Sequence, residues 1–148
     1  MILKGYDVML TSTDKLVGRQ TDKLTFTIGI TEGYFHNNEK FVYYYEYLDN
    51  SNKFVSLLKK CSSKIEKEHG IYISLNIIPS VTLYKEEWGC PKNGENTYTL
   101  SAIRNPVFHP DIELWRKAAV ALVKLLKSKL KQSTVTVEFS KVDMLYLN

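Results

Sequence analysis

An alternating run near the amino terminus limits the fold of this chain more than any other feature. In KLTFTIGITEGYF (residues 23–35), every second residue of the first part is large and apolar: Leu24, Phe26, Ile28 and Ile30. The residues between them are threonine or glycine. A period of two is typical of a strand with one buried face. We therefore predict a half-buried strand over this segment.

The remainder of the amino-terminal third contains two more candidate strands. YDVMLTST (residues 6–13) is a weaker candidate, and the polar stretch after it (residues 14–23) favours a loop or a bulged edge. The turn HNNEK (residues 36–40) leads into FVYYYEYL (residues 41–48), whose tyrosines favour a strand. We expect this strand to return beside the alternating one as a hairpin.

The second half contains a further hairpin and a closing strand. Residues 71–88 are rich in strand-forming residues, but Pro79 interrupts them, which indicates two short strands or one bulged strand near a sheet edge. A turn then leads to the strand NTYTLSAI (residues 96–103). The last strand lies in STVTVEFSKVDMLYL (residues 133–147).

Two segments have helical periodicity. Residues 49–70 start with capping candidates and end at Gly70, and their apolar stripe is formed by Phe54, Leu58, Cys61 and Ile65. Residues 110–132 form the second predicted helix, in which Pro110 is expected at the first helical position. Its acidic residues come early and its lysines late, as the helix dipole favours.

These elements follow the order β-β-α-β-β-α-β, with one extra strand at the front if residues 6–13 form one. Hairpins favour an antiparallel sheet, so we predict an α+β fold, a mostly antiparallel sheet with two helices packed on one face. The 148 residues, 44% of them hydrophobic, are enough for one domain spanning residues 1–148.

Charge and cysteine usage narrow the partners and the compartment. The net charge of +4 is modest, and no RNA-recognition motif or phosphate loop accompanies the basic run from Arg116 to Lys131, which argues against nucleic acid. No apolar run approaches the roughly 20 residues that cross a bilayer. The two cysteines and three histidines lack metal-ligand spacing, and no cofactor fingerprint is present. We therefore predict a soluble cytoplasmic protein without metal or cofactor.

The densest group of reactive side chains is EEWGCPKNGE (residues 86–95). Cys90 lies outside any periodic segment, and Glu86 and Glu87 precede it, so these three are the candidate catalytic residues. Turn chemistry is the alternative explanation, since Pro91 and Asn93-Gly94 shape a hairpin and Trp88 would pack on the core. We expect Cys90 to be accessible to thiol reagents, unlike Cys61.

Ligand contacts are also expected near strand ends, because loops on a rigid scaffold often carry function. Trp88, Arg104 and His109 are the candidate ligand-binding residues, with exposed loop polarity as the alternative.

The stretch CPKNGE (residues 90–95) resembles the Cys-Pro-x-Thr-Gly-Gln motif of the queuosine-pathway nitrile reductases. The likeness covers six residues. It implies a tunnelling fold and a nucleophilic role for Cys90. Thr97 stands where that family has an aspartate.

Two functions of different classes remain. The favoured one is a non-catalytic structural or protein-interaction subunit that self-associates through its sheet, because no nucleophile has a local base. The alternative is a small-molecule-binding protein or enzyme of tunnelling-fold type, with a site at a subunit interface around Glu86 to Glu95. Both predict a homo-oligomer, and the first also allows another protein partner.

Overall fold

The alternating segment belongs to a long strand, β1 (Leu16–Gly29), which lies inside the sheet. The computed structural model describes residues 16–30 and 51–147. Leu24, Phe26 and Ile28 are at most 2% exposed and point to the same side of the sheet. The prediction of a half-buried strand is therefore confirmed for residues 23–29.

The described residues form a sheet of four strands in the order β2-β3-β1-β4, and every neighbouring pair is antiparallel. β2 (Asn76–Thr82) and β3 (Glu95–Ile103) form the predicted hairpin, and β2 is an edge strand that contains Pro79. β4 (Val137–Leu147) forms the other edge. The predicted antiparallel α+β class is confirmed.

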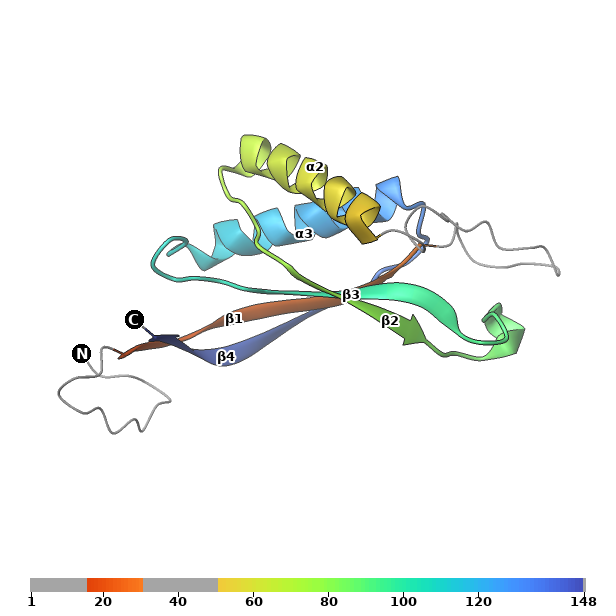
Figure 1. Ribbon diagram of the computed structural model, residues 1–148. Helices are drawn as coiled ribbons and strands as arrows, with labels where there is room; N and C mark the ends of the chain where they lie inside the picture. The colour runs from red at the N-terminus through yellow and green to blue at the C-terminus, as the bar shows by residue number, and fades with distance from the viewer. Residues whose placement is uncertain (1–15, 31–50, 148) are drawn as a thin grey trace.

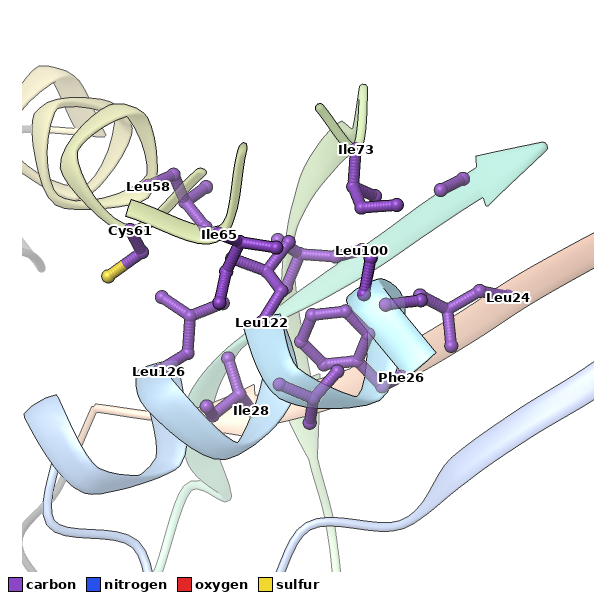
Figure 2. Packing of buried hydrophobic residues seen from close by; sticks show 14 of the residues in the cluster. Leu24, Phe26, Ile28, Leu58, Cys61, Ile65, Ile73, Leu100, Leu122 and Leu126 are labelled. Carbon is purple, nitrogen blue, oxygen red and sulfur yellow. The ribbon is translucent and has the colours of Figure 1, made fainter. Parts of the chain in front are cut away.

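In the part of the chain that the structure describes, the helices lie on one face of this sheet, as Figure 1 shows. α2 (Ser51–His69) and α3 (Ile112–Lys129) pack against each other and against the apolar side of the strands. Figure 2 shows Cys61 and Ile65 of α2 among the core side chains with Leu122 and Leu126 of α3. The predicted apolar stripe of the first helix is buried, no member being more than 4% exposed. None of the described helices is both long and apolar enough to cross a membrane.

The start of α3 differs from the prediction. Asp111 is the N-cap residue, and its side chain accepts hydrogen bonds from the backbone N–H groups of Glu113 and Leu114. Pro110 lies before the cap and is not the first helical residue. An aspartate satisfies two backbone donors that a proline would leave open, so the cap determines where the helix begins.

The polar stretch at residues 14–23 was wrongly predicted as a connection, since β1 already begins at Leu16. Residues 16–26 pair with β4, and residues 23–29 pair with β3. Thr21 and Asp22 are buried. Pairing with a distant strand, which local polarity does not reveal, extends β1 through this segment.

Three sequence predictions lie outside the described residues. They are the strand at residues 6–13, the turn at residues 36–40 and the strand at residues 41–48. The first predicted hairpin therefore stays a prediction.

Candidate functional site

The face of the sheet opposite the helices is rich in hydroxyl groups. Because side chains alternate along a strand, Thr25 and Thr27 of β1 lie opposite to the core residues between them, as does Thr97 of β3. A hollow of about 380 Å³ opens on this face, and residues 132–136, between α3 and β4, complete its wall. This volume lies within the range of small-molecule sites.

Hydroxyl groups near the hollow are linked by hydrogen bonds across the strands. The Ser80 hydroxyl lies 2.8 Å from that of Thr97 and 2.9 Å from that of Thr99. The Thr97 hydroxyl also lies 3.0 Å from that of Thr82, and Thr99 is 3.1 Å from Thr27. Each hydroxyl both donates and accepts, so the network holds these side chains in fixed rotamers while leaving capacity for a ligand.

Glu95, the first residue of β3, places a carboxylate in the hollow. A Cβ atom at Gly29 would lie only 2.6 Å from Glu95 Oε1 and 2.7 Å from Gln132 Oε1, so both side chains lie closely over the glycine backbone. Burial raises the pKa of the Glu95 carboxyl, and a hydrogen bond with the Tyr84 side chain partly offsets this. Glu95 is therefore a carboxylate that is partly desolvated next to an open site.

The charged side chains that line the hollow are all acidic among the described residues. Among the described residues that line the hollow, Glu95 and Glu138 are acidic and none is lysine, arginine or histidine. The helix layer on the other face of the sheet is the reverse, since α2 and α3 together carry ten lysine or arginine residues and three glutamates. A carboxylate-lined hollow on a basic protein favours a cationic small molecule.

The loop expected to be catalytic lies beside this hollow and contributes only its last residue. Glu86, Glu87 and Trp88 form a short 3-10 helix, and all three side chains are exposed, Trp88 to 67%. Glu87 forms an ion pair with Lys85 at 2.9 Å. The expectation that Trp88 packs on the core is wrong, because the 3-10 turn directs its ring outward next to Lys85.

Cys90 is only 6% exposed, contrary to our expectation of an accessible thiol. It does not line the hollow. Its catalytic role, like those of Glu86 and Glu87, stays a prediction that this geometry does not favour. Cys61 is buried in the core on the apolar stripe of α2, as predicted, and burial raises the pKa of its thiol.

Arg104 and His109 lie beyond the other end of β3, and the last residue of that strand is already about 26 Å from Glu95 at the usual rise of a strand. The structure therefore does not bring them together with the loop at residues 86–95 (Figure 1). Arg104 is 8% exposed and donates a hydrogen bond of 2.8 Å to the His109 carbonyl. Ligand binding by these two residues and by Trp88 stays a prediction.

Arg104 belongs to a buried ionic cluster centred on Asp22. Asp22 is fully buried, and its carboxylate lies 3.7 Å from Arg104 Nε, 3.2 Å from Arg116 Nη2 and 3.0 Å from Lys141 Nζ. These contacts tie β1 to the end of β3, to α3 and to β4. The arrangement accounts for Arg104 as a structural residue.

The residues that line the hollow were not predicted from the sequence. Glu95 was named only as the end of the loop around Cys90 and Thr97 only as a departure from a motif, and Gln132 and Glu138 were not named. A signal was present, because the threonines of KLTFTIGI and NTYTLSAI alternate with the core residues and so share one polar face. Which residues meet across that face depends on the strand register.

No group of three or more histidine, cysteine, aspartate or glutamate side chains that could hold a metal is found within residues 16–30 and 51–147.

The described residues thus form an α+β fold with a hollow lined by two carboxylates on the face of the sheet opposite the helices. The family model described as SAM lyase matches residues 19–148, so the chain belongs to the SAM lyase family. It is also similar to the solved structure of a phage SAM lyase in the apo state, with 17% identity over 87% of this chain and 90% of that one and a TM-score of 0.55. At this identity, the likeness concerns the fold.

A second solved structure, a phage SAM lyase in complex with S-methyl-5'-thioadenosine, is 18% identical over 86% of this chain and 90% of that one, with a TM-score of 0.49. Among curated proteins, no sequence matches this chain significantly.

Family membership corrects the favoured function. A non-catalytic structural or interaction subunit is the wrong class, because the match to an enzyme family spans nearly the whole chain. The enzyme alternative is better supported. The family is, however, that of the SAM lyases, and not the nitrile reductases that CPKNGE resembles.

Proposed function

We propose that this protein cleaves S-adenosylmethionine as a lyase and that the hollow beside Glu95 binds the substrate. The observation that carries the location is the charge of the lining, two carboxylates and no basic side chain among the described residues. S-Adenosylmethionine has a permanently positive sulfonium, which such a lining attracts. Family membership supports the reaction, cleavage to methylthioadenosine.

The bond cleavage needs little chemical activation, because the sulfonium releases a neutral thioether, which is a good leaving group. The bond between sulfur and the γ-carbon breaks, its electron pair neutralises the sulfur, and methylthioadenosine leaves as a neutral thioether. Since a lyase uses no water, the four-carbon remainder leaves in one of two ways. Its own carboxylate closes a lactone by attack on the γ-carbon, or a carboxylate of the lining accepts a β-proton while the C–H electron pair forms the double bond of an unsaturated amino acid. In the lactone route, positioning the substrate is the main catalytic task.

Glu95 acts in this proposal by binding the substrate. The positive charge on sulfur declines as the bond breaks, so a carboxylate beside it stabilises the bound substrate more than the transition state. Loss of that carboxylate therefore raises KM and leaves kcat unchanged or slightly higher. Because methylthioadenosine has no charge on sulfur, the attraction ends with the reaction, and the product is released.

The hydroxyl groups of Thr27, Thr82 and Thr97 would orient the substrate. All three residues line the hollow with Glu95, and the hydrogen bonds between strands fix their positions. Hydroxyls in such positions exchange hydrogen bonds with the ribose hydroxyls of a nucleoside.

The predicted homo-oligomer stays part of the proposal, because a hollow on an open sheet face is more easily closed by a second copy. Sedimentation of the purified protein measures this directly. A cytoplasmic location is supported by two free cysteines, which persist in a reducing compartment.

The experiment is to incubate the purified protein with S-adenosylmethionine and to identify both products by mass spectrometry. We expect methylthioadenosine together with a lactone or an unsaturated amino acid. Homoserine as the initial product would indicate a hydrolase, and unchanged substrate would refute the proposed activity.

A further inference from the structure

Among residues 16–30 and 51–147, nothing fully covers the helix-facing side of β4 next to α3. Two adjacent hollows of about 280 and 490 Å³ lie between α3 and β4, and Val120 and Lys124 border both of them. We call them together the α3–β4 groove. Its floor is apolar and consists of Val120, Ala121, Val123, Val135, Val137 and Phe139. The Phe139 side chain is 36% exposed although it faces the side of the core.

The rim of this groove is basic. It is formed by His69 from the end of α2 and by Arg116, Lys117, Lys124 and Lys127 from α3. Arg116 is already engaged, because it contacts Asp22 and lies over the Phe139 ring at 5.0 Å. For Lys117, Lys124 and Lys127, none of the described residues provides an acidic partner at ion-pair distance. The rim therefore offers three lysines beside an apolar floor.

We propose that the α3–β4 groove binds an acidic amphipathic helix of a partner protein. Such a helix would lie beside α3 as a third member of the helix layer, with its apolar stripe on the floor and its carboxylates next to Lys124 and Lys127. This is the helix-in-groove mode of recognition, in which apolar residues at helical spacing provide the anchors. Most of the floor lies on the helix-facing side of the sheet, away from Glu95, and Val135 borders both the groove and the hollow.

Charge and shape favour this occupant over two others. A second copy offers no acidic helix within the described residues, since α2 and α3 carry ten basic and three acidic side chains. Nucleic acid would neutralise the lysines through phosphates but leave the apolar floor in water.

The probe is a fluorescent 18-residue peptide of leucine, glutamate and alanine, with leucine at every third or fourth position. A peptide of the same composition with the leucines scattered around the helix controls for charge alone. The variant K124E/K127E reverses the rim, and K59E/K60E makes the same charge change on the outer surface of α2. Fluorescence anisotropy gives the Kd of each pair, and duplex DNA is added as a competitor.

We expect the patterned peptide to bind at least about tenfold more tightly than the scattered one, because only it buries the floor. K124E/K127E should weaken binding by about tenfold or more, and K59E/K60E by less than about threefold. Equal binding of the two peptides, equal effects of the two variants, or displacement of the peptide by DNA at physiological salt would each overturn the proposal.

Discussion

The Glu95 carboxylate occupies the space that a side chain at position 29 would fill. Glu95 Oε1 would lie 2.6 Å from a Cβ atom on Gly29, closer than real Cβ contacts allow. β1 pairs with β3 at this point, so the glycine lets the carboxylate lie low over the strand. The position of the Glu95 carboxylate in the hollow therefore depends on residue 29 having no side chain.

Replacing this glycine tests the relationship. In Gly29→Ala, the added methyl group must displace the ends of Glu95 and Gln132, which are side chains and can move. Because no backbone clash arises, we expect a free energy of unfolding within about 1 kcal/mol of wild type and a loss of about tenfold in kcat/KM. Urea unfolding and the methylthioadenosine assay measure the two effects.

Gly70→Ala is the matched control. Gly70 ends α2 with a φ of 74° and has nothing within 4 Å of an added Cβ atom. The change should destabilise the fold by about 1 kcal/mol through backbone strain and leave kcat/KM unaltered. If both alanine variants had the same activity, the role of Gly29 in placing Glu95 would be refuted.

The raised pKa of Glu95 predicts a pH dependence of substrate binding. Only the ionised carboxylate attracts the sulfonium, so kcat/KM should rise with pH as Glu95 loses its proton, above the ordinary value of 4.5. Glu95→Gln should abolish this limb of the pH profile. A profile that is unchanged in the variant would assign the titration to another group.

The same shift predicts an opposite effect on stability. With a pKa raised by burial, the folded state binds more protons than the unfolded state between the ordinary and the raised value. Stability should therefore fall as pH rises through this interval. Glu95→Gln should flatten the curve there, which urea unfolding at a series of pH values would detect.

The ionic cluster at Asp22 should contribute strongly to stability. Asp22→Asn leaves the buried Arg104 guanidinium without its carboxylate, and removing one partner of a buried pair costs about 3 kcal/mol or more. Glu68→Gln, which breaks the exposed pair with Lys64, should cost less than about 0.5 kcal/mol. Similar unfolding free energies for the two variants would contradict the structural role of Asp22.

A substitution of Cys90 distinguishes the catalytic loop predicted from the sequence from the hollow seen in the structure. We expect Cys90→Ala to keep at least about half of the wild-type kcat/KM, because the thiol is buried and does not line the hollow. Labelling of the native protein should be slow at Cys90 and at Cys61. A loss of activity with the fold intact would restore the predicted nucleophile.

Much of the fold could be predicted from local patterns. The alternation around Phe26 and the stripe from Phe54 to Ile65 are repeated over several residues, so they indicate a strand and a helix without knowledge of the rest. The extension of β1 through Asp22 could not be predicted in this way. Its polar residues form a strand because β4 and the cations around Asp22 hold them, and both are distant in sequence.

The lining of the hollow was harder to predict, because the register between β1 and β3 determines which residues lie next to each other. Attention to reactive residue types selected Cys90 and Trp88, whereas the hollow consists of common residues such as Thr97, Gly29 and Glu95. These residues form a hollow only because the pairing of β1 with β3 brings them together. The polar alternation indicates the face but not the partners.

The most direct test of the account is a steady-state comparison of wild type and Glu95→Gln with S-adenosylmethionine, following methylthioadenosine by chromatography. For wild type, we predict that methylthioadenosine accumulates as the substrate is consumed. For the variant, we predict a KM raised by about tenfold or more with a smaller change in kcat, because a charged hydrogen-bonding partner is lost from the bound substrate. No methylthioadenosine from wild type, or the same KM in both proteins, would contradict the account.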